Sequence, residues 1–412
     1  MQHKYRFHHT PELEDLVVDV ENRGEKIVVD VSGPRADDLG PFVEAYFQSF
    51  NEIGPLTCHE GRNVYSLYWP PVPSEAHARF VEAFWNTWFF GRQTPPVVTF
   101  AITDKCQCRC VHCGAATFDG KRSEISLSDM ERIVAECVAL GVTNVIYTGG
   151  EPLLHRDLEA CVALVPKEKA VAQVFSNAVA LDAARLQALK AAGLYAIKIS
   201  LDSPNPDEHD RLRGRPGVFA AVERGVRASL DAGLLVGLST YATNESVRTG
   251  HLPRVVELAA GWGIHEITVF DAHTAGRFRQ REDVTLTPES RRELLEQSRR
   301  LNAERAPRPR IITQSWTNTS SKFAKYVGCL AATSQFHITP SGDFTPCDFT
   351  PLSFGNVLKE PISTLWQKLV THPAYKTHCQ ECRMQSRAFR AKYVDAIPEN
   401  AILPYPIERL GD

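Results

Sequence analysis

Short apolar runs alternate with longer amphipathic segments through the middle of the chain. The apolar runs are rich in Val, Ile, Ala and Phe, and they lie at residues 97–102, 144–148, 171–176, 195–201, 234–240 and 264–270. Runs of this length predict buried strands, and the amphipathic segments between them predict helices. Repeated strand–helix units imply parallel strands joined by right-handed crossovers. We therefore expect an α/β domain with its chemistry at the carboxyl ends of the strands.

The first 95 residues have a different pattern, which predicts a separate α+β module. Alternating apolar residues predict one hairpin at 16–31 and a second around 60–63, and helical patterns occupy 42–50 and 74–90. The predicted order is ββαββα, and the pair Pro95-Pro96 marks the expected boundary with the α/β domain. Such a module either docks a substrate or partner, or covers one face of the next domain, and we favour the covering role.

Composition and charge exclude several classes of protein. The chain has 412 residues, of which 43% are hydrophobic and 23% charged, as in soluble globular proteins of two or three domains. The formal net charge of -3 provides no positive field for binding nucleic acid. No apolar run reaches the roughly 18 residues of a membrane-spanning helix, and residues 1–6 lack the apolar core of a signal peptide. We expect a cytoplasmic protein without membrane or nucleic-acid partners, in which metal ligation by cysteines is favoured over disulfides.

Most of the cysteines fall into two groups. The first group follows the strand predicted at 97–102 and comprises Cys106, Cys108, Cys110 and Cys113. The second group lies near the C-terminus and comprises Cys329, Cys347, Cys379 and Cys382. Cys137 and Cys161 share apolar helical stripes with their neighbours and are expected to be core thiols.

Three thiols of the first group, Cys106, Cys110 and Cys113, have the spacing C-x3-C-x2-C. Such a group can hold a metal, form disulfides or pack in a core. Structural zinc and ferredoxin-type clusters use four ligands. Three thiolates can instead bind three irons of a [4Fe–4S] cluster and leave the fourth iron open for a substrate or cofactor. Cys108 is expected to point away from such a cluster.

Polar and Gly-rich segments follow three further predicted strands. They are Gly149-Gly150-Glu151-Pro152, Ser176-Asn177 and Ser200-Leu201-Asp202. The cysteine spacing, with the aromatic His112 before its last cysteine, and the GGEP segment resemble the radical S-adenosylmethionine (SAM) enzymes over about residues 97–271. The resemblance implies an enzyme with a partial (β/α)6 TIM-like barrel, which we place, with the helix that follows it, at residues 96–310.

The resemblance also implies the chemistry. SAM would chelate the open iron, and one electron from the reduced cluster would cleave it to a 5′-deoxyadenosyl radical that abstracts a hydrogen atom from the substrate. A flavodoxin- or ferredoxin-type partner would supply the electron.

The roles of individual residues follow from the same resemblance. The carbonyls of Gly149 and Gly150 would accept from the SAM ammonium group, because neither residue has a Cβ to block the approach. Glu151 would help fix that turn and the ammonium group, and Asn177 would bind the ribose hydroxyls. Ser200 and Arg213, which lie in segments that resemble the SLD…HDxxRG pattern of one subgroup, would hold the SAM carboxylate.

The second cysteine group predicts a closed metal site in residues 311–412. Cys329 and Cys347 flank a predicted hairpin at 336–345, and Cys379 and Cys382 form a C-x2-C pair. Spacing alone does not separate zinc from a [4Fe–4S] cluster. The pattern resembles the SPASM/twitch extension of radical SAM enzymes, which implies an auxiliary [4Fe–4S] cluster with these four ligands. No cysteine follows Cys382 in the sequence, so we expect the shorter, twitch-like form.

A closed auxiliary cluster is expected to accept an electron. That role favours a net oxidation or a bond-forming modification of a peptide or protein side chain. The alternatives are a radical SAM dehydrogenase for a small molecule (a sugar, a tetrapyrrole or a cofactor precursor), an iron–sulfur electron-transfer protein and a zinc-stabilised binding module. Oxidation also needs a proton acceptor. Asp271, His273 and Asp348 are candidates, and the sequence assigns the role to none of them.

Overall fold

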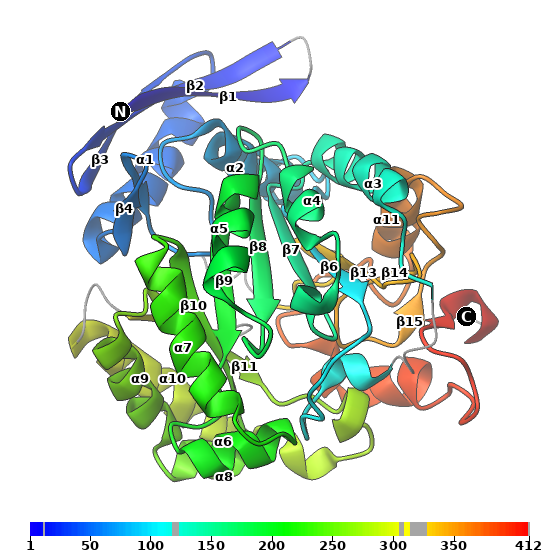
Figure 1. The fold of residues 1–412 in the computed structure, drawn as a ribbon. Helices are drawn as coiled ribbons and strands as arrows, with labels where there is room; N and C mark the ends of the chain where they lie inside the picture. Colours follow the sequence, from blue (N-terminus) through cyan, green and yellow to red (C-terminus); the bar gives the residue numbers. More distant parts are fainter. Residues whose placement is uncertain (11–12, 118–122, 305–308, 314–327, 411–412) are drawn as a thin grey trace.

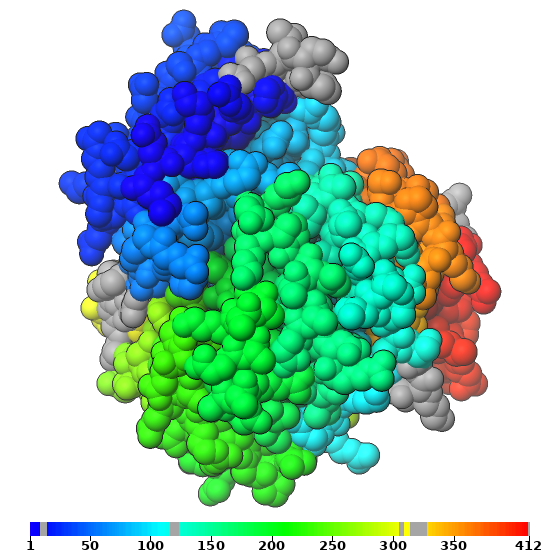
Figure 2. Space-filling view, turned by 45° about the horizontal axis from the view of Figure 1, so that its top comes forward, coloured from blue at the N-terminus to red at the C-terminus, as the bar shows by residue number. Residues whose placement is uncertain are grey.

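The computed structural model describes residues 1–10, 13–117, 123–304, 309–313 and 328–410. An N-terminal module, a central α/β region and a C-terminal segment pack around one large sheet (Figure 1). In Figure 2 the N-terminal module covers one end of the molecule, and the C-terminal segment lies along its side against the helices of the central region.

The central sheet has nine strands within the described ranges, in the order β12-β11-β10-β9-β8-β7-β6-β13-β14. The six predicted strands are confirmed as β6 (Val97–Thr103), β7 (Asn144–Gly149), β8 (Val171–Ser176), β9 (Leu194–Ser200), β10 (Leu235–Ala242) and β11 (Glu266–Asp271). They run parallel to one another, as the alternation of strands and helices predicts. The cysteine loop and the Gly-rich segment therefore follow neighbouring strands at the same edge of the sheet.

Two parallel strands extend the sheet beyond the six that the sequence predicts. β12 (Arg310–Thr313) pairs with β11, and β13 (Gln335–Ile338) pairs with β6. The predicted hairpin is present as β13 and β14 (Phe344–Thr345), but its first arm also belongs to the central sheet. Periodicity missed β12 because the strand is short, and it missed the pairing of β13 with β6 because local patterns carry no signal for so distant a partner.

Helices cover the outer face of the sheet (Figure 1). The longer ones are α3 (Leu127–Leu140), α5 (Ala183–Ala192), α7 (Val218–Asp231), α9 (His251–Trp262) and α10 (Pro288–Glu304), and the shorter ones are α4 (Leu158–Ala163), α6 (Pro206–Arg213) and α8 (Asn244–Arg248). The Ser126 side chain caps the start of α3, and Gly141 ends it in the left-handed region at φ 115°. Cys137 on α3 and Cys161 on α4 are fully buried, which confirms both as core thiols.

The N-terminal module contains one strand more than the sequence predicts. A three-stranded antiparallel sheet, β1 (Gln2–Thr10), β2 (Leu13–Arg23) and β3 (Lys26–Ser32), packs on α1 (Ala36–Ile53). The short hairpin β4 (Thr57–His59) and β5 (Arg62–Val64) follows, and then α2 (Glu75–Trp88). The order is therefore βββαββα. β1 escaped prediction because Tyr5 and Phe7 are its only buried apolar side chains among polar neighbours.

The C-terminal segment shares one hydrophobic core with the central region. Its remaining elements are β15 (Leu352–Ser353), α11 (Ile362–Thr371), α12 (Arg387–Phe389) and β16 (Tyr405–Pro406). Trp366 on α11 is fully buried, and its indole Nε1 donates to the carbonyl of Gln93 at 2.8 Å. None of the helices in the described ranges is long and apolar enough to cross a membrane.

Candidate functional site

The first cysteine loop is held at its backbone by two other segments. The amides of Arg109 and Val111 each donate at 2.9 Å to carbonyls at the end of α6, those of Arg213 and Leu212. A Cβ on Gly214, which has φ +64°, would lie 2.6 Å from the carbonyl oxygen of Arg109, so only glycine permits this approach. The far end of the loop packs on residues 276–277, where the Arg277 side chain donates to Cys110 O at 2.7 Å. The backbone of the loop is thus held by contacts with two other parts of the chain.

The Gly-rich segment after β7 supports the start of the same loop. The amides of Gly150 and Glu151 donate to the carbonyls of Thr103 and Lys105 at 2.7 and 2.8 Å. A Cβ on Gly149 would collide with Thr103 O, and one on Gly150 would lie 2.6 Å from Asp104 O. Both glycines are therefore required for packing against the segment that leads into the cysteines, whatever contact they also make with SAM.

Glu151 is buried and ties together the loops after β7 and β8. One carboxylate oxygen accepts from Leu153 N at 3.1 Å and from the Ser176 hydroxyl at 2.8 Å, and the other accepts from Asn177 N at 2.8 Å. Burial raises the pKa of Glu151 to about 7, although these hydrogen bonds oppose the shift. The predicted role of Glu151 in fixing the turn thus has a structural basis in contacts with two strand ends.

Two side chains predicted to bind SAM also reach the cysteine sulfurs. The Asn177 amide donates to Cys106 Sγ at 3.7 Å, and an Arg213 Nη1 donates to Cys110 Sγ at 3.6 Å. Both distances are in the range of hydrogen bonds to sulfur. Hydrogen bonds to ligand sulfurs tune the reduction potential of iron–sulfur clusters. Ser200 lies beside them at the end of β9, where its hydroxyl accepts from Ser239 Oγ at 3.3 Å.

Arg213 is paired with Asp202, which sequence reasoning did not assign. The guanidinium Nε and Nη2 lie 2.6 and 2.8 Å from the two carboxylate oxygens, and both side chains are at least nine-tenths buried. Burial alone would raise the pKa of Asp202, but Arg213, His112 and His209 together lower it below its usual value. The SLD segment marked Asp202 in the sequence, but nothing in the sequence showed that Asp202 pairs with Arg213.

Cys108 lies beside Cys106 and does not face away from the site. Cys108 is buried and lines the same cavity as the three predicted ligands, and its amide donates to Cys106 Sγ at 3.4 Å. The hydrogen bond from the Cys108 thiol lowers the pKa of Cys106 to about 6. Cys108 is therefore a neighbour that favours the thiolate of a predicted ligand.

The second cysteine group is also brought together. Gly328 and Cys329 pack on the backbone of Cys379, where Cys329 N donates to Cys379 O at 2.8 Å. Burial raises the pKa of the Cys347 thiol to about 12, and the nearby Cys329 adds to the shift. Burial likewise raises the pKa of Cys382, with further contributions from Cys329 and Cys347. Thiols this close and this buried are stable as thiolates only beside a compensating positive charge.

The donor geometry fits iron–sulfur clusters better than mononuclear zinc. In the described residues no three His, Cys, Asp or Glu side chains converge as the ligands of a single ion must. Each thiolate of a cluster binds a different iron, so cluster ligands surround a larger group and need not meet at one point. The two cysteine groups supply the donor type and the numbers of thiols, three and four, that such clusters use.

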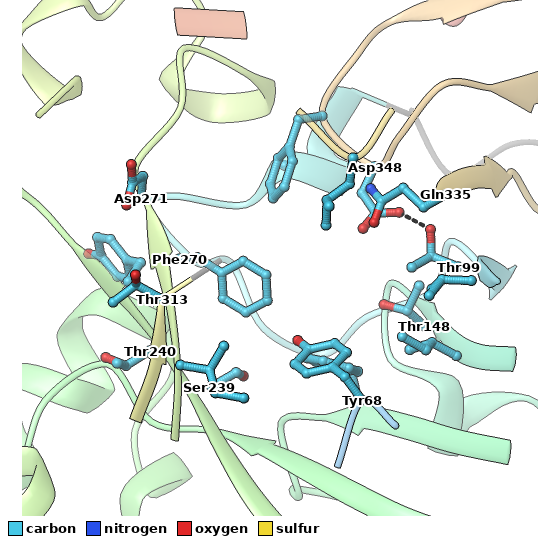
Figure 3. Close-up of a pocket in the computed structure, with 18 of the residues that line it drawn as sticks. Tyr68, Thr99, Thr148, Ser239, Thr240, Phe270, Asp271, Thr313, Gln335 and Asp348 are labelled. Carbon is cyan, nitrogen blue, oxygen red and sulfur yellow. Dashed lines mark hydrogen bonds between the residues drawn. The ribbon is translucent and has the colours of Figure 1, made fainter. Parts of the chain in front are cut away.

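One cavity of about 980 Å³ joins the two cysteine groups. Its lining includes all four cysteines of the first loop, Cys329 of the second group and the six residues predicted to bind SAM. The volume is at the upper end of the range for small-molecule sites. Figure 3 shows Asp271 and Asp348 at one end of this cavity, and Tyr68, Ser239 and Thr240 at the other.

Asp348 is the candidate proton acceptor that the structure connects best to its surroundings. It follows Cys347, accepts a short hydrogen bond from Thr99 (Figure 3), and lies 2.6 Å from His337 Nδ1. Burial alone would raise the pKa of Asp348, but His337 lowers it below its usual value, so the carboxylate is ionised at neutral pH. His337 was missed in the sequence because β13 was predicted only as the arm of a hairpin.

The other two candidates have different surroundings. Asp271 is buried and accepts from Gln385 at 3.2 Å, next to the C-x2-C pair. His273 stacks edge-on against Phe349 at 4.6 Å, and burial together with Arg291 lowers its pKa to about 4. His273 is therefore neutral at physiological pH and is a poor acceptor for a full proton.

Comparison with known proteins gives two family matches. The Radical SAM superfamily matches residues 100–246, and the SPASM iron-sulfur cluster-binding domain matches residues 329–383. The AdoMet-dependent heme synthase of Methanosarcina barkeri (strain Fusaro / DSM 804) is 24% identical over 74% of this chain and 95% of its own length. The PqqA peptide cyclase of Rhizobium meliloti (strain 1021) is 25% identical over 72% of this chain and 82% of its own length.

A solved structure shares the fold across nearly the whole chain. Streptococcus suis SuiB bound to its precursor peptide SuiA superposes with a TM-score of 0.57, at 13% identity, over 89% of this chain and 88% of that one. The likeness extends over the N-terminal module, the central sheet and the C-terminal segment.

Proposed function

Since this chain is a radical SAM enzyme with a C-terminal SPASM domain, and so uses SAM and [4Fe–4S] clusters, we propose that it oxidises or cross-links a side chain of a peptide or protein. Cys106, Cys110 and Cys113 would hold the cluster that binds SAM, and Cys329, Cys347, Cys379 and Cys382 would hold the auxiliary cluster. Gly149, Gly150, Glu151, Asn177, Ser200 and Arg213 would surround SAM. When bound, SAM and its cluster would supply a 5′-deoxyadenosyl radical that takes a hydrogen atom from the substrate. The auxiliary cluster would supply an acceptor for one further electron.

The observation that carries the proposal is the cavity that is lined by all four cysteines of the first loop and by Cys329 of the second group. A substrate in that cavity lies within reach of the first loop and of the second group at the same time. Removal of a hydrogen atom followed by an electron leaves a cation, which must lose a proton to give a neutral oxidised product. Asp348 is ionised, faces the cavity and is held by His337 and Thr99, so it is the residue we assign to that proton.

The charge of the cavity favours a peptide over a tetrapyrrole. The cationic side chains among its described lining residues are Arg213, Arg299 and Arg310, and each has a partner. A haem precursor carries several carboxylates and requires cations that are free to pair with them. The ionised, partly exposed carboxylate of Asp348 would repel such a substrate. The precursor peptide bound in SuiB and the peptide substrate named for PqqA peptide cyclase support the same choice.

The test uses the anaerobically reconstituted enzyme with SAM, a chemical reductant and two sets of substrates. One set contains short peptides encoded beside the gene, synthesised with deuterated side chains, and the other contains haem-type tetrapyrroles that are deuterated on their own side chains. We expect deuterium in the released 5′-deoxyadenosine and a peptide that has lost two hydrogens. Deuterium transfer from tetrapyrroles alone would overturn the peptide assignment in favour of the small-molecule alternative. Electrons are expected from a flavodoxin or ferredoxin of the cytoplasm, which should replace the chemical reductant.

A double variant and a control variant test the auxiliary site. Replacement of Cys379 and Cys382 by Ala should preserve release of 5′-deoxyadenosine but abolish the oxidised peptide. The exposed Cys58, on β4 of the N-terminal module, provides the matched control, because Cys58→Ala should change neither product. Full yield of the oxidised product from the double variant would show that the second group is not the electron acceptor.

A further inference from the structure

A loop of the N-terminal module closes the end of the barrel opposite the cysteines. The floor loop, residues 65–69, lies across the amino ends of the strands and is held there by their side chains. Its backbone carbonyls accept hydrogen bonds of 2.6–3.2 Å from Asn144 on β7, Gln173 on β8, Tyr195 on β9 and Arg310 on β12. Glu266 on β11 accepts from Ser66 Oγ at 2.7 Å and from Leu67 N at 3.0 Å. The loop is therefore bound to five strands at once.

The strands are shaped to receive this loop. Leu67 is fully buried, and a Cβ on Gly237 of β10 would lie 3.0 Å from its terminal methyl group. The absence of a side chain at Gly237 thus makes room for a residue of the module. The covering role predicted for the first 95 residues takes a specific form here, because the module fills the inside of the barrel and does not only lie over its surface.

Tyr68 of the floor loop covers a buried cation. Lys198 is fully buried, and its Nζ lies 3.2 Å from the centroid of the Tyr68 ring. The same Nζ donates to Glu266 at 2.9 Å and to Thr268 at 3.0 Å, so all its polar contacts lie beneath the ring. Tyr68 also lines the cavity that leads to the cysteines (Figure 3).

Two further aromatic rings line the cavity beside Tyr68. Phe175 on β8 and Phe270 on β11 meet edge to face with their centroids 6.3 Å apart, and both remain partly exposed inside the barrel. In Figure 3 the Phe270 ring lies between Tyr68 and the carboxylate of Asp271. Partly exposed aromatic rings in a cavity are sites where an apolar group gains from burial.

We propose that Tyr68, Phe175 and Phe270 form a subsite for a neutral apolar or aromatic side chain of the substrate, and that the N-terminal module thereby sets specificity through Tyr68. Aromatic cages more often bind cations. Here the ammonium group of Lys198, paired with Glu266, already lies against the Tyr68 ring, so the ring already has one cation partner. The inference rests on the proposed function only in assigning the bound group to a peptide.

The subsite is tested by binding, without turnover, to the anaerobically reconstituted holoenzyme. The probes are 4-fluorotoluene, 4-fluorobenzylammonium and 4-fluorobenzoate, which share one fluorinated ring and differ in charge, and their affinities are measured by fluorine NMR. We expect 4-fluorotoluene to bind at least several-fold more tightly than either charged probe. Tightest binding of the ammonium probe would overturn the proposed selectivity.

Variants assign the binding to the subsite. Tyr68→Ala should weaken the binding of 4-fluorotoluene by about tenfold, because it removes one of the aromatic rings that the probe contacts. Tyr68→Phe keeps the ring and should retain the wild-type affinity. Phe219→Ala is the matched control, since Phe219 packs on Trp262 and is not among the described lining residues. If Tyr68→Ala fails to fold by circular dichroism, Phe270→Ala replaces it with the same expectation. Unchanged affinity in the folded variant would overturn the proposal, whether or not peptide oxidation has been found.

Discussion

Gly214 and Gly217 provide a matched pair for testing whether the end of α6 positions the first cysteine loop. Both adopt left-handed backbone, with φ +64° and +81°, so alanine at either position carries a similar strain of about 1 kcal/mol. Their surroundings differ. A Cβ at Gly217 would meet nothing within 4 Å, whereas one at Gly214 would lie 2.6 Å from Arg109 O, in the middle of the loop.

The clash at Gly214 has a calculable consequence for the cysteines. Carbon–oxygen contacts are ordinarily about 3.3 Å or longer, so relief requires the backbone near Cys108 and Cys110 to move by about 0.7 Å. Ligand constellations tolerate displacements of about 0.5 Å. We therefore expect Gly214→Ala to lose the SAM-binding cluster and Gly217→Ala to retain it.

The assay is iron content and SAM cleavage after anaerobic reconstitution. Wild type and Gly217→Ala should hold about eight irons per chain, and Gly214→Ala about four, since the auxiliary cluster is unaffected. Only Gly214→Ala should fail to release 5′-deoxyadenosine. Equal iron content and equal SAM cleavage in the two variants would refute the reasoning, because the strain common to both would then account for every effect.

Two further predictions concern the buried charges. Asp202→Asn leaves Arg213 without its ionic partner, so urea denaturation should show a loss of about 3 kcal/mol at pH 7, whereas Glu289→Gln, in an exposed pair with Arg292, should cost less than about 1 kcal/mol. The pKa of Asp202 is lowered in the folded chain, so its carboxylate stabilises the fold above the usual Asp pKa of about 4. This stabilisation is lost as the pH falls through the lowered pKa. The difference in stability between wild type and Asp202→Asn should therefore shrink in acid. Asp348→Asn should leave 5′-deoxyadenosine release intact and reduce oxidised peptide at least about tenfold, while Asp343→Asn, on the neighbouring turn, should change neither yield. Equal losses of both products in Asp348→Asn would contradict its assignment to the proton.

Local sequence patterns correctly predicted those features of the structure that depend on residues close together in the sequence. The six strands of the central region, the hairpin of the C-terminal segment and the core positions of Cys137 and Cys161 all follow from short apolar runs and helical spacing. The cysteine groups were found by spacing, because ligands of one cluster often come from a single loop. These features require no knowledge of what packs against them.

What the sequence did not disclose depends on distant partners. Arg213 was predicted to hold the SAM carboxylate, but its pairing with Asp202 and its contact with Cys110 arise only when α6 folds over the loop. Tyr68 lies in a segment without periodicity, and its place in the barrel is set by hydrogen bonds to five strands. Pairwise contacts across long separations carry no local signature, so the partners of Arg213 and the position of Tyr68 were found only from the fold.

The parallel pairing of β13 with β6 fixes the relation between the two cysteine groups. β6 leads directly into Cys106, and β13 leads through one hairpin into Cys347, with Thr99 opposite His337 in the register. Adjacent strands of one sheet lie about 4.8 Å apart and do not hinge. The relative position of the two cysteine groups is thus set by backbone hydrogen bonds between these strands. Exchange of the C-terminal segment between related enzymes should preserve electron transfer only where the incoming strand keeps this register.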